Sequence, residues 1–287
     1  MILVDYSQLS LNVILGVGEN PTGNIYDTPE QLITHLILNK LRTYNTRFKR
    51  KYGDIVVCLE GRRNWRSDIF PNYKIARKSS RKDSNIDWDR VYVIMEDSIK
   101  LLQTTFPYSI IRVEKCEADD VIGVLSKLIN EPNLIVSSDK DFGQLKSHHN
   151  VDIFDPRKEA FVTLEITPQQ LLLEHVIQGD NSDSIPNILT GDDHFISEIR
   201  LRQKAITAKY KENFLPRLRR GELTQEEIAN FKRNSSLIDL NSIPKDIKLK
   251  ILETFENYKI EGNMQKVMQY FIENGFSNFL DCIEDFS

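Results

Sequence analysis

The sequence predicts an α/β fold, with a mostly parallel central sheet flanked by helices and a helical C-terminal part. Short apolar runs alternate with longer segments of helical spacing over residues 1–165, which is the pattern of a parallel sheet. From residue 166 to 287 the remaining segments have helical patterns. The chain has 287 residues, 40% of them hydrophobic, so it can bury a substantial core.

Five apolar runs are short, continuous and rich in Ile, Val or Leu, as in strands that are covered on both faces. They are residues 2–4, 55–59, 109–113, 134–136 and 151–154. Helices are expected between them and after them, near 6–15, 28–52, 88–104, 117–129, 168–178, 196–215, 224–234, 245–258 and 263–275. Thr28 is expected to cap one of them, because Pro29 and Gln31 follow at the N1 and capping-box positions.

Acidic residues stand where several of these strands end. The carboxyl ends of parallel strands meet at one edge of a sheet, so these acids are expected to lie together. They are Asp5, Glu60, Glu117, Asp119, Asp120, Asp139 and Asp141. A hard cation such as Mg²⁺ or Mn²⁺ would relieve their mutual repulsion. The alternative is a solvated acidic loop and a helix start that favours carboxylates through the helix dipole.

The spacing in E-A-D-D leaves the metal ligand open. Ideal helical geometry places Glu117 and Asp120 about 60° apart and turns Asp119 away. If the helix begins only at Asp119, both Glu117 and Asp119 can reach the same site. All three therefore stay candidates.

Residues 62–82 form a basic segment directly after a strand-end acid. Its cations are Arg62, Arg63, Arg66, Lys74, Arg77, Lys78, Arg81 and Lys82, and Trp65, Phe70 and Tyr73 are interleaved with them. Basic groups neutralise phosphates, and aromatic faces stack on unpaired bases. We expect this segment to bind nucleic acid and to be mobile without it, since little apolar surface is available for burial. A solvated charged loop is the alternative.

Composition excludes several classes of protein. The net charge is −4, so any basic surface must be local. Three cysteines without CxxC spacing argue against a disulfide framework or a zinc site and favour a reducing compartment. No apolar run reaches membrane length. The five histidines lack metal-ligand spacing and are expected to be structural or surface residues.

Five motifs in order resemble the 5′-nuclease (flap endonuclease) superfamily, and within it the ribonuclease H type of T-even bacteriophages. They are D-Y-S at 5–7, W-R-S-D-I-F-P-N-Y-K-I-A-R at 65–77, E-A-D-D at 117–120, S-S-D-K-D-F at 137–142 and G-D-N-S-D at 179–183. The resemblance covers almost the whole chain. Two positions depart from the family pattern: Glu60 replaces the usual Asp, and the glycine-rich hairpin after residue 183 is poorly kept.

The resemblance implies a PIN-like nuclease domain over 1–165, with a basic arch at 62–82, and a DNA-binding helical domain over 166–287. It implies a 5′→3′ exonuclease with flap endonuclease activity on RNA–DNA hybrids and DNA, using two Mg²⁺ ions that Mn²⁺ can replace. Two ions about 4 Å apart can stabilise the attacking and the leaving oxygens of a phosphodiester.

By the same resemblance, Asp180 and Asp183 join the metal ligands, and Asp139 is a shared, catalytic ligand. Lys74 and Arg77 contact the reacting phosphate, and Tyr73 stacks on a base. The remaining nucleic-acid contacts are Arg62, Arg66, Lys78, Arg81 and Lys82. The implied setting is a monomer in the cytoplasm of a bacterial host, with single-strand DNA-binding protein or a sliding clamp as partners. A non-catalytic module that binds branched DNA is the alternative function.

Overall fold

The computed structural model describes residues 1–18, 30–128, 131–197 and 202–287. Its centre is a six-stranded sheet within these ranges, in the order β3-β2-β1-β4-β5-β6. The strands are β1 (Ile2–Asp5), β2 (Ile55–Leu59), β3 (Ser109–Arg112), β4 (Asn133–Val136), β5 (Val151–Asp155) and β6 (Ala160–Phe161). All neighbouring pairs are parallel except β5 and β6. The expected α/β fold is confirmed.

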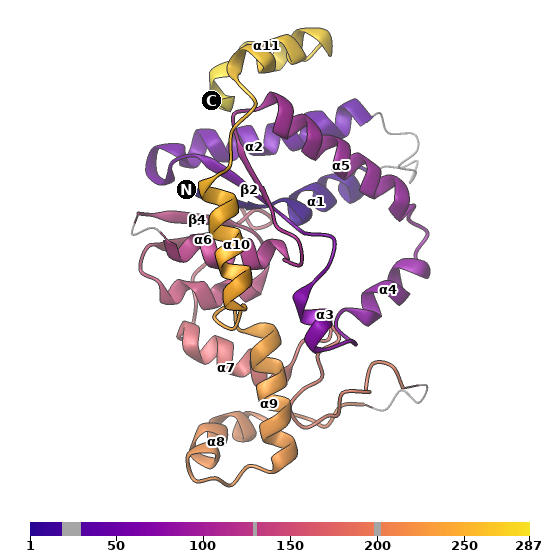
Figure 1. Cartoon of the computed structure of the whole chain (residues 1–287), viewed down its shortest axis with the longest axis vertical. Coiled ribbons are helices and arrows are strands. Elements are labelled where there is room, and N and C mark those ends of the chain that lie inside the picture. The colour runs from indigo at the N-terminus through magenta and orange to yellow at the C-terminus, as the bar shows by residue number, and fades with distance from the viewer. Residues whose placement is uncertain (19–29, 129–130, 198–201) are drawn as a thin grey trace.

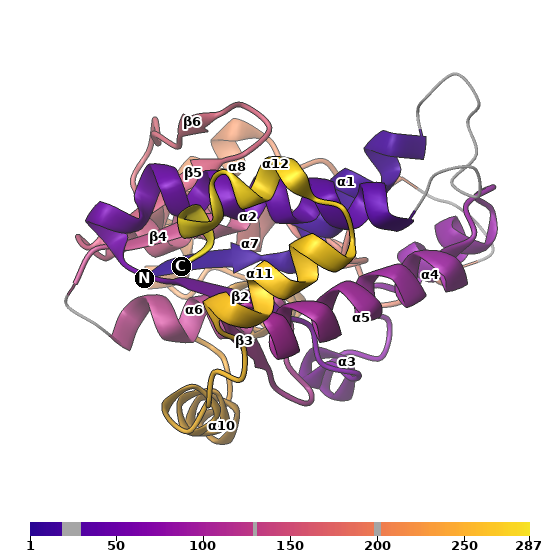
Figure 2. The same cartoon turned by 90° about the horizontal axis from the view of Figure 1, so that it is seen from above.

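Helices cover both faces of the sheet, as Figure 2 shows from above. The helices up to β6 are α1 (Tyr6–Gly18), α2 (Glu30–Tyr52), α3 (Trp65–Ile69), α4 (Ile75–Lys82), α5 (Trp88–Thr105), α6 (Ala118–Leu128) and the 3₁₀ helix η2 (Lys140–Ser147). Those after it are α7 (Pro168–Gln178), α8 (Ala208–Arg219), α9 (Gln225–Ile238), α10 (Lys245–Glu256), α11 (Met264–Glu273), α12 (Ser277–Leu280) and the 3₁₀ helix η3 (Ile283–Phe286).

Side chains of β1 alternate between two apolar layers because successive residues of a strand point to opposite faces. Ile2 and Val4 join the layer formed with α1, α2, α5 and α11. Leu3 joins the layer formed with α6, η2 and α10. All three are fully buried, which explains why this strand reads as a continuous apolar run.

The strand order reverses beside β1. From β1 the chain moves outward to β2 and then β3, and it later returns to place β4 on the other side of β1. In open α/β sheets a crevice forms at such a point, outside the carboxyl ends of the strands. The acids that follow β1 and β4 therefore lie beside this crevice, where open α/β sheets bind their ligands.

The C-terminal part has two different relations to the sheet. Helices α7, α8 and α9 gather at one end of the molecule (Figure 1) around smaller apolar clusters. Helices α10, α11 and α12 instead join the apolar layers of the sheet, with Ile251 of α10 in one layer and Phe271 of α11 and Phe279 of α12 in the other. The domain boundary at residue 165 stays a prediction, and the end of the chain from α10 onward completes the sheet's own core.

One expected helix is shorter than predicted, and one expected helix cap falls outside the described residues. The helix expected near 196–215 begins only at Ala208 and ends at Arg219, with Thr207 as its cap. Residues 198–201 and the expected cap at Thr28 lie outside the described residues. Within the described ranges, no helix is both long enough and apolar enough to cross a membrane.

Candidate active site

Carboxylates from three strand ends meet at the crevice beside β1. Asp5 ends β1, and burial together with the negative charges of Glu60 and Asp139 raises its pKa to about 6. Asp119 lies in the first turn of α6, and burial followed by the charges of Asp5, Glu117 and Asp139 raises its pKa well above the usual range. The mutual effects show that the acids at these strand ends form one electrostatic cluster.

Asp139 shapes the turn after β4. Its backbone N–H donates to Ser137 Oγ at 3.1 Å, and its Oδ1 accepts from the N–H of Asp141 at 2.9 Å. The second bond caps η2, so the chain turns sharply and presents two carboxylates within three residues. The pKa of Asp141 is raised to about 7: burial raises it most, His175 opposes this, and the negative charges of Asp139 and Asp180 add to the rise.

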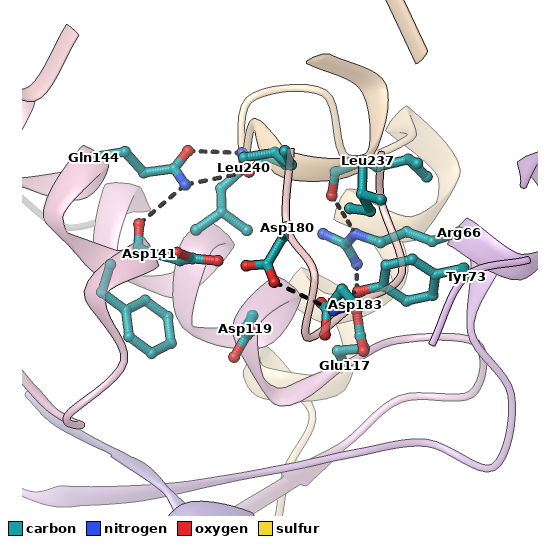
Figure 3. Close-up of a pocket in the computed structure, with 13 residues that line it drawn as sticks. Arg66, Tyr73, Glu117, Asp119, Asp141, Gln144, Asp180, Asp183, Leu237 and Leu240 are labelled. Atoms are coloured by element: carbon teal, nitrogen blue, oxygen red, sulfur yellow. Dashed lines mark hydrogen bonds and ion pairs between the residues drawn. The ribbon is translucent and has the colours of Figure 1, made fainter. Parts of the chain in front are cut away.

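The loop after α7 delivers Asp180 and Asp183. Gly179 has a φ of 67°, and a Cβ there would lie 2.4 Å from the carbonyl oxygen of Ile185, so only glycine fits without strain. Asp180 Oδ1 accepts three bonds from its own loop: Ser182 N at 2.7 Å, Ser182 Oγ at 2.6 Å and Asp183 N at 3.2 Å. This loop therefore holds both carboxylates in fixed positions, Asp183 beside Glu117 (Figure 3) and Asp180 beside His175.

Arg66 is not an exposed phosphate ligand, contrary to expectation. It is 2% exposed and its guanidinium pairs with Glu117 Oε2 at 2.9 Å and Asp120 Oδ1 at 2.8 Å. Its Nε donates to the carbonyl oxygen of Leu237 at 2.8 Å (Figure 3). Arg66 thus ties α3 to α6 and to the end of α9, which is a structural role.

Replacing Arg66 is expected to destabilise the fold. Arg66→Ala leaves the buried Asp120 without its cation and removes one of the two cations beside Glu117, and breaking such a buried pair costs about 3–5 kcal/mol of unfolding free energy. Chemical denaturation of the two proteins measures this. The control is Arg63→Ala, an exposed neighbour that should change stability by less than about 0.5 kcal/mol. Equal effects of the two substitutions would contradict the structural role.

Asp120 was one of three candidate ligands in E-A-D-D, and its placement does not support that role. It is 0% exposed. Besides pairing with Arg66, its Oδ2 accepts from Trp65 Nε1 at 3.0 Å and from the N–H of Glu117 at 2.9 Å. Helix α6 begins at Ala118, so Glu117 lies before the helix and ideal helical spacing does not apply to it. Asp119, not Asp120, lines the pocket with Glu117.

Tyr73 is also placed differently from the expectation that it stacks on a base. Its ring is 6% exposed and packs with Phe70, Val176 and Leu237. Its hydroxyl reaches Glu117 Oε2 and Asp183 Oδ2, both at 2.9 Å. In this structure Tyr73 positions two acids of the pocket and presents no free ring face.

Lys74 and Arg77 converge on the same carboxylate, that of Asp183. Lys74 precedes α4 with a left-handed φ of 57°, and its Nζ pairs with Glu117 and lies 3.8 Å from Asp183 Oδ2. Arg77 pairs with Asp183 Oδ1 and donates from Nε to the carbonyl oxygen of Ser182 at 3.1 Å. Burial disfavours the charged form of Glu117, but the positive charges of Lys74 and Arg66 have the larger effect and lower its pKa to about 2.

The rest of the basic segment is more exposed. Arg62 and Lys82 are exposed, and Arg81 lies over the rings of Trp88 and Tyr92 at 5.0 and 5.6 Å. The side chain of Lys78 lies outside the described part of the structure. The expectation that residues 62–82 bury little apolar surface was wrong. Trp65, Phe70 and Tyr73 are all buried and anchor α3 and the residues that lead into α4. Figure 1 shows α3 and α4 between α5 and the α7–α9 end.

Two residues of the site were missed. His175, expected to be structural or on the surface, lies between Asp141 and Asp180. Its only signal in the sequence is its position five residues before Asp180, in the last turn of α7. Gln144 donates to the carbonyl oxygens of Asp141 and Ile238 and accepts from the N–H of Leu240, so it joins η2 to the end of α9 (Figure 3).

The raised pKa values predict how stability depends on pH. Asp5 and Asp141 have folded-state pKa values of about 6 and about 7, above the ordinary value of 3.8. At pH values between the ordinary and the folded-state pKa, the folded state therefore binds more protons than the unfolded state. Stability consequently rises as pH falls through this range. We expect the melting temperature of the protein in chelator to rise as pH is lowered from about 7 to about 5.

The variant Asp141→Asn tests this expectation. Because it lacks one of the two carboxyls with a raised pKa, its melting temperature should depend less on pH than that of the native protein. The acids with lowered pKa, Glu117 and Asp180, act in the opposite sense only at pH values below their ordinary pKa. A melting temperature that falls steadily over the same pH range would contradict the assignment of raised pKa values.

Comparison with known proteins agrees with this arrangement. A model of the "5′–3′ exonuclease, N-terminal resolvase-like domain" matches residues 17–174, and a model of the "T4 RNase H, C terminal" region matches residues 167–286. Ribonuclease H of Enterobacteria phage T4 is 27% identical, over 99% of this chain and 95% of that protein. Flap endonuclease Xni of Shewanella pealeana is 28% identical over 44% of this chain, and this chain spans only 49% of its length.

The fold comparison gives the same result. A flap endonuclease of bacteriophage T5, solved as a variant in a pseudo-enzyme–product complex with DNA and metal ions, superposes with a TM-score of 0.58. It covers 89% of this chain and 99% of the T5 chain at 17% identity, which establishes a common fold. With a family model spanning more than half of its length, the chain belongs to the 5′–3′ exonuclease family.

Proposed function

We propose that this 5′–3′ exonuclease and flap endonuclease uses two Mg²⁺ ions and removes RNA primers from RNA–DNA hybrids, together with adjacent DNA, during replication. Its ligands are then the acids at the strand ends and in the loop after α7. They are Asp5, Glu60, Glu117, Asp119, Asp139, Asp141, Asp180 and Asp183. We place this activity in the cytoplasm of a phage-infected bacterium, where single-strand DNA-binding protein or a sliding clamp could join a monomeric enzyme.

One observation carries the proposal: buried and half-buried carboxylates accumulate at the crevice without enough cations to neutralise them. Asp5, Asp119 and Asp141 all have raised pKa values, and in the described ranges no Lys or Arg forms an ion pair with any of them. Asp141 Oδ1 is buried and has no hydrogen-bond partner among those residues. All-oxygen donor sets of this kind suit Mg²⁺ and Mn²⁺.

The basic residues beside the acids give the site a way to hold a phosphodiester. Lys74 and Arg77 now neutralise Glu117 and Asp183. When divalent cations are bound, they supply charge stabilisation and water activation for hydrolysis. The ammonium of Lys74 and the guanidinium of Arg77 are then available to a phosphate and can offset the charge that grows on it.

Further from the acids, Arg62, Arg81 and Lys82 offer general positive charge along the path of a single strand. Several cations of the C-terminal part are engaged elsewhere: Lys211 pairs with Glu174 at 2.7 Å and Arg217 with Glu227 at 3.1 Å. The basic surface of that part is therefore smaller than its composition indicates.

A module that binds branched DNA without cleaving it is the alternative. Such a module gains nothing from carboxylates that repel phosphates, so the acid cluster favours the enzyme. The two are separated by incubating a 5′-labelled DNA flap and a 5′-labelled RNA–DNA hybrid with the protein, in Mg²⁺ and in EDTA. We expect short labelled products in Mg²⁺ only. Tight binding in Mg²⁺ without any product would support the alternative.

A further inference from the structure

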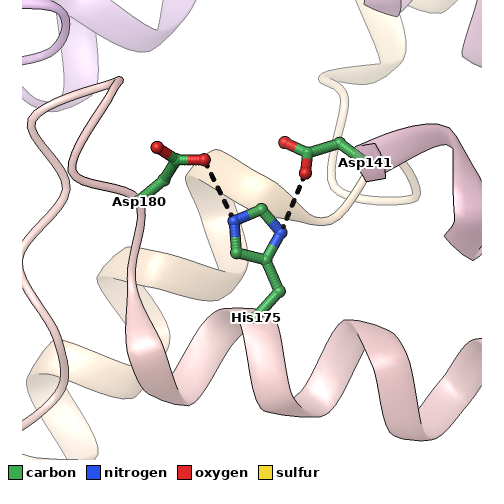
Figure 4. Close-up of side chains that lie close together, drawn as sticks. All are labelled: Asp141, His175 and Asp180. Atoms are coloured by element: carbon green, nitrogen blue, oxygen red, sulfur yellow. Dashed lines mark hydrogen bonds and ion pairs between the residues drawn. The ribbon is translucent and has the colours of Figure 1, made fainter. Parts of the chain in front are cut away.

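The imidazole of His175 bridges two carboxylates of the site (Figure 4). Its Nδ1 lies 3.3 Å from Asp141 Oδ1, and its Nε2 lies 3.2 Å from Asp180 Oδ2. The side chain is 12% exposed, and it comes from the last turn of α7, just before the loop that carries Asp180. His175 is thus the one imidazole beside the acids of this corner, within the described residues.

The two carboxylates that face His175 differ in how far they are satisfied. Asp180 uses Oδ1 for three donors of its own loop and Oδ2 for His175 Nε2. Asp141 Oδ1 is buried, and its contact with Nδ1 falls outside hydrogen-bond geometry, so it has no hydrogen-bond partner in the described part of the chain. Nε2 of the ring therefore has a hydrogen-bond partner, whereas Nδ1 faces a carboxylate oxygen that has none among the described residues.

We propose that His175 Nδ1 and Asp141 are ligands of one divalent cation, while Nε2–H donates to Asp180. Histidines that bind metals usually donate their second ring N–H to a carboxylate, which fixes the tautomer and the ring orientation. Asp180, one of the acids proposed as ligands, then acts on this cation through its contact with His175 instead of binding it directly. The imidazole and both carboxylates offer ligand atoms that all lie within 4.8 Å of one another.

The distances between the donors agree with this assignment. An ion with ligand bonds of about 2.1 Å in octahedral geometry has neighbouring ligand atoms about 3 Å apart. The 3.3 Å separation of Nδ1 and Asp141 Oδ1 is close to that value. A contact of this length with poor hydrogen-bond geometry is what two ligands of a common ion would show.

A nitrogen ligand changes which ion this position prefers. Imidazole suits transition-metal ions, whereas Mg²⁺ favours oxygen donors. His175 therefore gives this position a preference for Co²⁺ or Zn²⁺ that an all-carboxylate site would lack. This inference rests on the proposed function, because it concerns one of the cations that the function requires.

The test is electron spin-echo modulation of Mn²⁺ bound to the whole protein. We expect a ¹⁴N coupling that becomes a ¹⁵N coupling when the protein is grown on ¹⁵N-histidine, which requires no substitution. The coupling should vanish in His175→Gln and persist in His149→Gln, an exposed histidine outside the site. In parallel, His175→Gln should raise the Co²⁺ Kd about tenfold or more and the Mg²⁺ Kd by less than about twofold.

The outcomes separate this inference from the proposed function. Mn²⁺ that binds without any histidine coupling overturns the inference, makes His175 only a bridge between two loops, and leaves the proposed function standing. A protein that binds no Mn²⁺ at all overturns the proposed function itself. Circular dichroism of His175→Gln distinguishes a lost ligand from a lost fold, and the labelled native protein gives its answer in either case.

Discussion

Asp139→Asn is expected to reduce hydrolysis of a 5′ flap by about 10³-fold or more, the scale of losing an important electrostatic group in an active site. Asp139 interacts with the charges of Asp5, Asp119 and Asp141, so its carboxylate lies at the centre of the cluster. Asparagine keeps an oxygen that can accept from the N–H of Asp141, which preserves the cap of η2. The substitution therefore removes charge while the turn is kept.

Binding of the flap should survive in Asp139→Asn, because removing a negative charge lessens the repulsion of phosphate. Single-turnover cleavage and flap affinity are measured on the same samples. The control is Asp97→Asn, an exposed acid on α5 that should leave both quantities unchanged. Near-normal turnover of Asp139→Asn in saturating Mg²⁺ would exclude a central role for this carboxylate.

Lys74→Ala is expected to lower the single-turnover rate by about 10²-fold, the size of a lost electrostatic stabiliser. Lys74 is held between Glu117 and Asp183, where a reacting phosphate would meet the carboxylates. Lys82, at the end of α4, is exposed. Lys82→Ala should therefore weaken binding and flatten its salt dependence, with little change in rate at saturating enzyme.

Single-turnover kinetics at saturating enzyme and at two salt concentrations separate these effects. If more enzyme fully restores the rate of Lys74→Ala, then Lys74 contributes to binding rather than to chemistry. Because Lys74 also neutralises Glu117, the melting temperature of the variant is measured alongside, so that a loss of stability is not taken for a loss of rate.

The sequence allowed the sheet to be predicted but hid parts of the site. Each strand is a short apolar run because it is covered on both faces, and no distant information is needed to recognise it. Arg66 and Tyr73 were misjudged because their partners, Leu237 and Glu117, are remote in sequence. A basic segment with aromatic residues has the same composition whether those residues stack on bases or anchor the segment to a core.

The acids illustrate the same limit. That Asp5, Asp119 and Asp139 gather at one edge follows from parallel strands alone. The roles of Asp119 and Asp120 depend on where α6 begins and on Arg66 and Trp65, distant residues that bind Asp120 inside the fold. His175 could be found only by knowing that α7 ends against η2, a contact between segments that share no local pattern.

The most direct test of the account is to locate the cations. Crystals of the protein soaked in Mn²⁺ are measured near the manganese edge, and an anomalous difference map is calculated. The account predicts two peaks, one among Asp5, Glu60, Asp119 and Asp139 and one beside Asp141, and loss of intensity at both in Asp139→Asn. A map with no peak among these carboxylates, from crystals that bind Mn²⁺ elsewhere, would contradict it.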